Sequence, residues 1–477
     1  MATVGRAGPD AAADTAGRPA IAGVGDADSV LGDRARSLID TQELGWRAKG
    51  LPLDGRFAVA EDLRAARSSL FDAGFVTPVA TLRASALEAN LRAMAEYCAA
   101  STRDASSVLF APHGKTTMSP QLFDAQLAHG AWGITLATPW QLRVAVEFGI
   151  PRMLLANELV DPAALGWVAD TLLHDPDVTL LSYVDDLDVV DWGGELLAAH
   201  GAPRPLDVLL EVGYHGGRTG VRGAAAVDTL AAAVDDSPAH RLAGVAGYEG
   251  GFGHDATPET IAGIREHLRE VRASAERLDA AGLLPGERVV LTAGGSSFFD
   301  LVVDELSGAL SSGRPVDVII RSGGVISHDE GLYGEVSPFV RRPELRELSG
   351  GALEAPTEIW ARVLSRPEEE LALLDVGRRD VPYDQRMPSV HRAFHAPGAQ
   401  APTTPAAMEA LADADGWEVL KVDDQHGYLR LPATSPLASG DLVVLGITHP
   451  CTFFDKWRAL PVVDDDGLIL DVVHTYF

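Results

Sequence analysis

Short apolar runs alternate with longer helical segments through much of the chain, and this pattern restricts its fold more than any other feature. The runs are rich in β-branched residues and have the length of buried strands. Eight such runs lie at residues 107–111, 132–136, 152–156, 178–183, 206–212, 241–247, 288–293 and 316–321. Helix-length segments separate them, among them residues 139–148, 162–173, 258–280 and 297–311, and several begin with proline or a capping residue. The alternation predicts an α/β fold, a (β/α)8 TIM barrel.

The chain has 477 residues, whereas single hydrophobic cores stop growing at roughly 250 to 300, so we expect a second domain. Strand-like runs with turns follow residue 350, at 357–364, 371–376, 427–431, 441–447 and 468–473. We predict the barrel at residues 70–345 and a mostly-β domain at 350–477, with a contribution from residues 31–69. Residues 391–416, rich in Ala, Pro and Thr, predict a surface loop or a short helix. Few large apolar side chains occur in residues 1–30, which predicts a disordered tail.

Charge and composition exclude several classes of partner. With 39 basic and 68 acidic residues, the formal net charge is −29, which would repel nucleic acid and anionic lipid. No apolar run reaches the ~18 residues of a membrane-spanning helix, and the N-terminus lacks a basic stretch followed by an apolar one, so we expect a cytoplasmic protein. Two cysteines are too few for a secreted disulfide scaffold. Cys98 lies in an apolar helical stretch, which leaves Cys451 to be explained.

In barrels of this type the catalytic groups follow the carboxyl ends of the strands. The first strand is followed by Ala111-Pro112-His113-Gly114-Lys115. A lysine at a barrel mouth can lose solvation, which lowers its pKa toward the neutral amine that Schiff-base chemistry requires. Most loop lysines are simply solvated, however, so Lys115 alone is weak evidence.

The last four strand ends carry residues suited to a phosphorylated ligand. Strand five is followed by a glycine-rich stretch with Arg218 and Thr219, and strand six by Tyr248-Glu249-Gly250. These glycines let the backbone approach a ligand, although flexible loops are the alternative interpretation. Strands seven and eight end in Gly294-Gly295-Ser296 and Ser322-Gly323-Gly324, where barrels commonly bind phosphate.

His449 and Cys451 follow the apolar run at residues 441–447 and share one face if strand geometry continues. Imidazole nitrogen and thiolate sulfur together suit zinc, and two protein ligands would leave the ion open to substrate. A buried histidine and cysteine at a strand end is the alternative, which the pattern alone favours.

In the order of these motifs the chain resembles the fold-type III pyridoxal phosphate enzymes, the alanine racemase-like family. The resemblance covers about residues 70–477. Within the family the chain resembles the branch of D-serine dehydratases and D-threonine aldolases, and within that branch an amino-acid deaminase-like subgroup. The motifs that carry it are His113 to Thr117, Arg218 to Gly220, Tyr248 to Gly250, Gly294 to Ser296 and His449 to Cys451. The sequence departs from the pattern after strand eight, where it lacks a Pro-Gly-x-Tyr run. Residues 377–384 form a further subgroup feature of unassigned role.

The resemblance implies a role for each motif. Lys115 would form the Schiff base with pyridoxal 5′-phosphate, Arg218 would stack beside the ring, and Tyr248 would approach the pyridine nitrogen. The implied cofactor-binding residues are Lys115, His113, Arg218, Thr219, Tyr248, Gly294, Gly295, Ser296 and Gly323. His449 and Cys451 resemble the zinc pair of D-serine dehydratases, with another divalent metal as an alternative.

By this resemblance the expected reaction is the β-elimination of a D-3-hydroxy amino acid such as D-serine, giving a 2-oxo acid and ammonia. In it Lys115 removes the Cα proton and the metal activates the leaving hydroxyl. The same groups could instead cleave Cα–Cβ, as in a D-threonine-type aldolase. A racemase would need a second base, and a non-catalytic cofactor-binding protein is a further alternative. Members of the family are typically homodimers.

Overall fold

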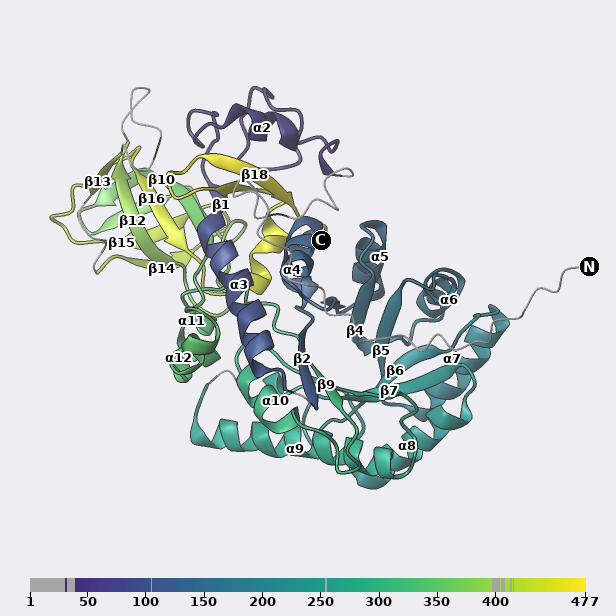
Figure 1. Cartoon of the computed structure of the whole chain (residues 1–477). Coiled ribbons are helices and arrows are strands. Elements are labelled where there is room, and N and C mark those ends of the chain that lie inside the picture. Colours follow the sequence, from purple (N-terminus) through teal and green to yellow (C-terminus); the bar gives the residue numbers. More distant parts are fainter. Residues whose placement is uncertain are drawn as a thin grey trace, which may run out of the picture.

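The computed structural model describes residues 31, 39–103, 105–253, 255–396, 404, 408–411, 414 and 416–477. The predicted tail at residues 1–30 lies outside the described residues. The described chain forms one sheet of eight strands, which helices surround, and one sheet of ten strands beside it (Figure 1).

All eight strands of the first sheet are parallel, and they pair in the order β2-β9-β8-β7-β6-β5-β4-β3. They are β2 (Ser106–Phe110), β3 (Ile134–Leu136), β4 (Arg152–Glu158), β5 (Thr179–Val184), β6 (Leu206–Glu211), β7 (His240–Ala246), β8 (Val289–Ala293) and β9 (Val316–Ile320). Each coincides with one of the eight predicted apolar runs. The predicted fold class is therefore confirmed.

Hydrogen bonds join the two ends of this row of strands. Trp132 N–H donates to the carbonyl of Phe110 at 2.7 Å, and Thr135 N–H donates to Pro112 O at 3.0 Å. The Thr135 hydroxyl also donates to Ala111 O at 2.6 Å. These bonds lie between β3 and the segment that follows β2, so they close the barrel beside the turn that carries Lys115.

Helices pack on the outside of the strands (Figure 1). They are α3 (Ala84–Ser101), α4 (Pro120–Ala128), α5 (Pro139–Glu147), α6 (Pro162–Thr171), α7 (Leu187–Ala199), α8 (Ala224–Asp236), α9 (Pro258–Ala280) and α10 (Phe299–Leu306). Proline occupies the first turn of α5, α6 and α9, and the preceding Thr138, Asp161 and Thr257 accept backbone N–H groups of the first turn. These caps explain why the helices begin where the sequence predicts.

The strands have two faces, because successive side chains point to opposite sides. One set packs against the helices in the large core, for example Val108 and Val208. The alternate set, including Leu154, Tyr183 and Leu209, forms a separate cluster inside the barrel. The next inward position along each strand therefore lies at the barrel mouth, where ligands bind.

The second sheet runs in the order β13-β12-β16-β10-β1-β17-β18, and β11, β15 and β14 extend from β10. Its strands are β1 (Val79–Arg83), β10 (Thr357–Glu368), β11 (Leu371–Leu374), β12 (Ser389–His395), β13 (Glu409–Leu411), β14 (Glu418–Val422), β15 (Gly427–Arg430), β16 (Leu442–Gly446), β17 (Ala459–Val463) and β18 (Ile469–His474). The predicted surface loop or short helix at residues 391–416 is wrong in part. β12 pairs with β16 and β13, so edge pairing decided the structure there rather than composition.

The remaining helices are short. α2 (Ala60–Ala66) packs with β18, and α11 (Leu332–Val336), α12 (Pro338–Arg341) and α13 (Leu345–Leu348) follow the barrel. Leu44, Leu63 and Phe75 pack on Val444 and Val472 of the ten-stranded sheet. Residues 39–75 thus cover one face of that sheet, although the domain boundaries themselves stay a prediction.

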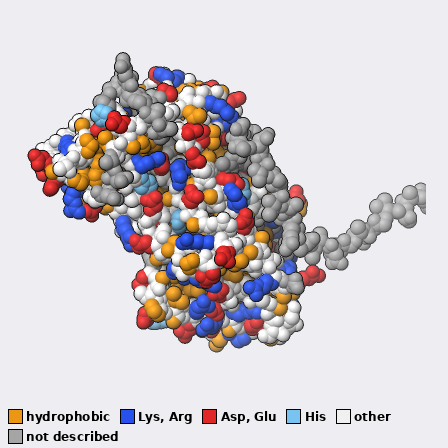
Figure 2. Space-filling view, turned by 60° about the vertical axis from the view of Figure 1, so that its left-hand side comes forward, with side chains coloured by type: hydrophobic (Ala, Val, Ile, Leu, Met, Phe, Trp, Pro, Cys, Tyr) orange, Lys and Arg blue, Asp and Glu red, His pale blue; other side chains and the backbone are white. Residues whose placement is uncertain are grey.

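Two surface observations bear on the expected partners. On the face shown in Figure 2, basic side chains are interspersed with acidic ones rather than gathered in one large patch. No helix among the described residues is both long and apolar enough to cross a bilayer.

Gly244 in β7 offers a test of the barrel packing. A Cβ atom there would overlap the carbonyl oxygen of Val290 in β8 and lie 2.7 Å from its carbonyl carbon. We expect Gly244→Ala to separate the two strands and to lower the free energy of unfolding by about 1–3 kcal/mol. The midpoint of urea unfolding measures this effect.

Gly351→Ala is the matched control, because no atom lies within 4 Å of a Cβ at that position. Its unfolding free energy should stay within about 0.5 kcal/mol of the wild-type value. Equal midpoints for Gly244→Ala and the wild type would show that β7 and β8 are not packed this closely.

Candidate active site

Lys115 lies where the sequence predicts, just after β2, in the short 3-10 turn η1 (Gly114–Thr116). A Cβ atom at Gly114 would lie 2.8 Å from the ring of Phe123, so only glycine fits immediately before the lysine. The Gly114 carbonyl accepts the N–H of Met118 at 2.8 Å, which holds the turn. The lysine is therefore presented from a rigid turn at the mouth of the barrel.

The surroundings of Lys115 favour its neutral amine. Its side chain is accessible to solvent, but the walls of the mouth remove part of its hydration. This burial lowers the pKa of Lys115, the cations Arg218 and Arg321 lower it further, and the Cys451 thiolate opposes them. A lysine with a lowered pKa can act as a nucleophile and as a base near neutral pH.

Aromatic contacts connect the loops that follow β6 and β7. The rings of Tyr214 and Phe252 are stacked, with centroids 4.1 Å apart. The guanidinium of Arg218 lies 4.2 Å from the ring centroid of Tyr248. Thr219 lies in the same loop as Arg218, and its carbonyl oxygen packs against Gly213. The structure thus brings Arg218 and Tyr248 together, and these loops are packed rather than free.

The loops after β8 and β9 meet at Ser296. Its hydroxyl accepts the N–H of Gly324 at 2.9 Å and interacts with the Tyr333 hydroxyl. A Cβ atom at Gly324 would lie 2.5 Å from the Tyr333 ring. The Gly295 N–H donates instead to the buried carboxylate of Glu249 at 2.7 Å. The Ser296 and Tyr333 hydroxyl groups thus lie together at the predicted phosphate position, while the N–H groups of Gly324 and Gly295 are already bound to Ser296 and Glu249.

Gly323 connects this region to the lysine turn. A Cβ atom there would lie 2.5 Å from the His113 carbonyl oxygen and 2.9 Å from Thr116 Oγ1. The buried Nδ1 atom of His113 has no hydrogen-bond partner among the described residues. Burial and the neighbouring cations, Lys115 first, keep the pKa of His113 well below its usual value. Its ring is therefore neutral beside Lys115.

His449 and Cys451 lie next to the lysine turn. Cys451 is part of η4 (Pro450–Thr452), and its sulfur lies 3.6 Å from the Thr116 hydroxyl oxygen. Burial raises the pKa of the Cys451 thiol, but hydrogen bonds from His449 and Thr116 and the charge of His449 outweigh it, and the pKa is lowered. Burial lowers the pKa of His449, yet Cys451 and Asp384 raise it to about 9.

Asp384 explains part of the 377–384 segment, whose role the sequence left unassigned. One of its carboxylate oxygens pairs with His449 Nδ1 at 2.6 Å, and the other accepts the Thr452 hydroxyl at 2.7 Å. The carboxylate leaves Nε2 of His449 as the ring nitrogen available to a ligand.

Arg321 is a second residue that sequence reasoning missed. It follows β9 and is buried, and it donates to the Thr292 hydroxyl at 2.6 Å and to Gly247 O at 3.0 Å. Its cation lowers the pKa of Lys115 and of His113. The signal in the sequence was an arginine directly after the wholly buried strand β9.

These residues fit the two groups that the sequence predicts. Pyridoxal phosphate requires a lysine that can lose its proton, a phosphate cradle and ring contacts. The mouth supplies Lys115, the Ser296 region and the Arg218–Tyr248 pair. A metal ion requires deprotonated donors. The lowered pKa of Cys451 favours its thiolate, and a bound metal would replace the Nε2 proton of His449 while Asp384 holds Nδ1.

Sequence comparisons agree with this geometry. The model of the putative serine dehydratase domain matches residues 357–463. A D-threonine aldolase of Arthrobacter sp. is 26% identical over 399 residues, which are 83% of this chain and 91% of the aldolase. A 3-hydroxy-D-aspartate aldolase of Paracoccus denitrificans is 26% identical over 351 residues, 73% of this chain and 83% of that enzyme.

Solved structures share the fold. D-threonine aldolase from Filomicrobium marinum superposes with a TM-score of 0.67 at 24% identity, over 84% of this chain and 95% of that one. D-threo-3-hydroxyaspartate dehydratase from Delftia sp. HT23 superposes with a TM-score of 0.61 at 20% identity, over 84% of this chain and 98% of that one. Two variants of a D-threo-3-hydroxyaspartate dehydratase also share the fold. One has alanine in place of a histidine, and the other, in a metal-free form, has alanine in place of a cysteine two positions later.

The fold, the lysine at the barrel mouth and these relatives agree with one another. The chain is similar over most of its length to lyases of D-3-hydroxy amino acids, and its fold is that of the alanine racemase-like, fold-type III pyridoxal phosphate enzymes.

Proposed function

We propose that this enzyme eliminates the β-hydroxyl group of a D-3-hydroxy amino acid such as D-serine, giving a 2-oxo acid and ammonia. The observation that carries the proposal is the contact between the lysine turn and the cysteine turn, with Thr116 Oγ1 3.6 Å from Cys451 Sγ. This contact supports the proposal, because the proposed base and the proposed metal donors would lie close enough together to act on neighbouring carbon atoms of one substrate.

The residues proposed to hold pyridoxal phosphate surround the mouth of the barrel. They are Lys115, His113, Arg218, Thr219, Tyr248, Gly294, Gly295, Ser296 and Gly323, to which the geometry adds Tyr333. When bound, the cofactor withdraws electrons from the α-carbon of the substrate. Arg218, whose guanidinium lies 4.2 Å from the ring centroid of Tyr248, would orient the cofactor ring together with that tyrosine. The Ser296 hydroxyl would bind the phosphate.

Lys115 is the proposed base for the Cα proton. Its Nζ must be uncharged to accept a proton, and burial with Arg218 and Arg321 lowers its pKa toward that state. The same cations would attract the carboxylate of the substrate. The close packing of Gly114 on Phe123 fixes the backbone from which the Lys115 side chain extends.

His449 Nε2 and Cys451 Sγ are the proposed metal donors. A zinc or similar divalent ion there would act as a Lewis acid and make the β-hydroxyl a better leaving group. Asp384 holds the imidazole through Nδ1, which fixes the orientation of Nε2. The variants of the dehydratase relative, which replace a histidine and a cysteine at the same spacing, support this assignment.

A second candidate function is the cleavage of Cα–Cβ to glycine and an aldehyde. The curated relatives at 26% identity are aldolases, which favours it. Cleavage needs removal of the proton from the β-hydroxyl group, whereas elimination needs departure of the whole group. The putative serine dehydratase domain over residues 357–463, which contains His449 and Cys451, supports elimination.

Replacement of Lys115 tests the cofactor site. Lys115 is one of four lysines in the chain. We expect Lys115→Ala to lose the visible absorption of a lysine–cofactor imine and to lose turnover, because among the described residues no other lysine follows a strand of the barrel. Borohydride reduction of the wild-type holoenzyme followed by peptide mapping should locate the cofactor on residue 115.

Lys421→Ala is the matched control, since Lys421 is exposed on β14, away from the barrel. It should keep the spectrum and the activity. Cofactor trapped on Lys49, Lys421 or Lys456 would refute the assignment.

Replacement of Asp384 tests the metal pair. We expect Asp384→Asn to weaken zinc binding by about 10–100-fold, as loss of a carboxylate behind a metal-binding histidine does. Cys451 can be followed directly, because Cys98 is buried with its pKa raised to about 12 and stays unreactive. Zinc should protect metal-free wild-type protein from alkylation, and Asp384→Asn should need more zinc for equal protection.

Asp455 is exposed and lies four residues after Cys451, so Asp455→Asn is the matched control. The zinc concentration that protects Cys451 from alkylation should be the same in this variant as in the wild type. Alkylation of Cys451 at the same rate with and without zinc would show that the metal binds elsewhere.

Product analysis separates the two reactions. With D-serine we expect pyruvate and ammonia in equal amounts, and with D-threonine 2-oxobutyrate and ammonia. Glycine plus acetaldehyde from D-threonine, without a 2-oxo acid, would establish the aldolase instead. L-serine formed from D-serine would indicate racemisation.

A further inference from the structure

Three carboxylates meet at the mouth of the barrel on the side formed by β4, β5 and β6. Glu158 ends β4, Asp185 directly follows β5, and Glu211 ends β6. In these strands Leu154, Leu181, Tyr183 and Leu209 pack inside the barrel. Asp185 and Glu211 follow such inward positions by two residues. Glu158 lies beyond a register shift in β4 but pairs with the inward-pointing Tyr183, so all three carboxylates lie on the inner side.

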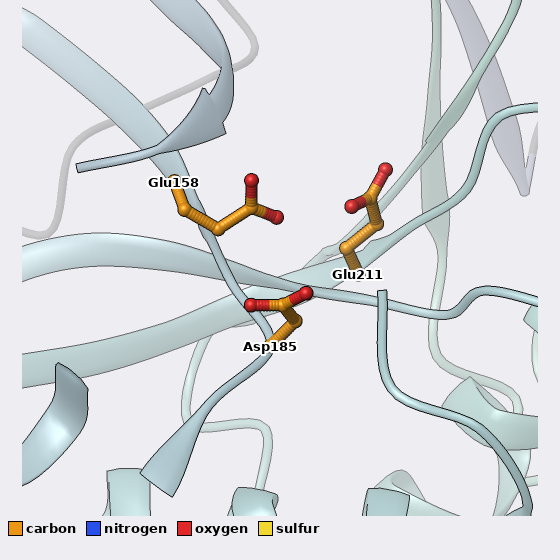
Figure 3. A group of neighbouring side chains, drawn as sticks. All are labelled: Glu158, Asp185 and Glu211. Atoms are coloured by element: carbon orange, nitrogen blue, oxygen red, sulfur yellow. The ribbon is translucent and has the colours of Figure 1, made fainter. Parts of the chain in front are cut away.

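These side chains share one small space. At least one carboxylate oxygen of each residue lies within 4.8 Å of the others, and Figure 3 shows the three carboxyl groups turned toward one another. No lysine or arginine of the described chain forms an ion pair with any of them. Like charges at this separation repel strongly unless a cation or a proton lies between them.

Two of the carboxylate oxygens, one on Glu158 and one on Glu211, lack a hydrogen-bond partner among the described residues. Glu211 is only 2% exposed, and its Oε2 atom has no hydrogen-bond partner among the described residues. The same holds for Oε1 of Glu158. A buried ionised carboxylate without a partner costs several kcal/mol, so such groups are normally paired or coordinate metals. Burial and then the charge of Glu211 raise the pKa of Glu158 to about 8, which reflects this strain.

We propose that Glu158, Asp185 and Glu211 bind a divalent cation of the hard class, such as Mn2+, Mg2+ or Ca2+. Carboxylate oxygens are the ligands that these ions prefer, whereas the thiolate and imidazole of Cys451 and His449 suit zinc. The two sites therefore select different ions. This second site does not depend on the reaction proposed above.

The cation would also order the loop after β6. One oxygen of Asp185 accepts the N–H of Gly220 at 2.9 Å, and Gly220 lies two residues after Arg218. A cation bound to Asp185 would fix that carboxylate and, through it, the loop that presents Arg218. The proposed role is thus to hold three strand ends and a cofactor-binding loop in position.

Manganese titration of the zinc-loaded holoenzyme tests the proposal, with free Mn2+ measured by its EPR signal. Preloading with zinc fills the His449–Cys451 pair, so that added Mn2+ reports on the carboxylates. We expect the wild type to bind one Mn2+. Glu211→Gln and Asp185→Asn should each weaken binding at least about 10-fold, since loss of a direct ligand costs no less than loss of an outer-shell partner.

Glu195→Gln is the matched control, because Glu195 is exposed on α7 and outside the cluster. It removes one negative charge and should leave Mn2+ binding unchanged. Asp185→Asn keeps an acceptor for Gly220 N–H, so it remains informative if Glu211→Gln folds poorly. The proposal fails if the wild type binds no Mn2+, as a proton shared between Glu158 and Glu211 would predict, or if both variants bind it like the wild type.

Discussion

The contact between Thr116 and Cys451 brings the two halves of the candidate site together. Thr116 belongs to the turn after the first barrel strand, and Cys451 to the turn after β16 of the ten-stranded sheet. Their side chains lie 3.6 Å apart. The proposed cofactor lysine follows a strand of one sheet and the proposed metal donors follow a strand of the other, so the candidate site depends on how the two sheets pack. Asp384 holds the turn of Cys451 through His449 and Thr452, and Gly323 packs against the turn of Lys115.

The charge around Lys115 at the barrel mouth is opposite in sign to the net charge of the chain. The chain carries a formal charge of −29, yet Lys115, Arg218 and the buried Arg321 gather near the lysine turn. A local cationic field in an acidic protein would select an anionic cofactor and an anionic substrate. The same cations, after burial, lower the pKa of Lys115, so one arrangement would serve both the proposed binding and the proposed proton transfer. The carboxylates of Glu158, Asp185 and Glu211 form the opposite, acidic side of the mouth.

Much of the fold was predictable because buried parallel strands are continuous apolar runs, and all eight were identified. The strands β12 and β13 were missed, since a segment rich in Ala, Pro and Thr acquires strand structure only by pairing with β16. The strand-end rule predicted where Lys115, Arg218 and Ser296 lie. Asp384 could not be found, because its bond to His449 spans 65 positions of sequence. The spacing of residues along the chain does not predict a contact between side chains so far apart in the sequence.

An X-ray structure of the zinc-soaked holoenzyme, with anomalous data collected at the zinc edge, tests the central claim most directly. The account predicts one strong zinc peak bonded to His449 Nε2 and Cys451 Sγ, and cofactor density continuous with Lys115 Nζ in the same cavity. Zinc at another position, or cofactor density joined to a different lysine, would contradict it.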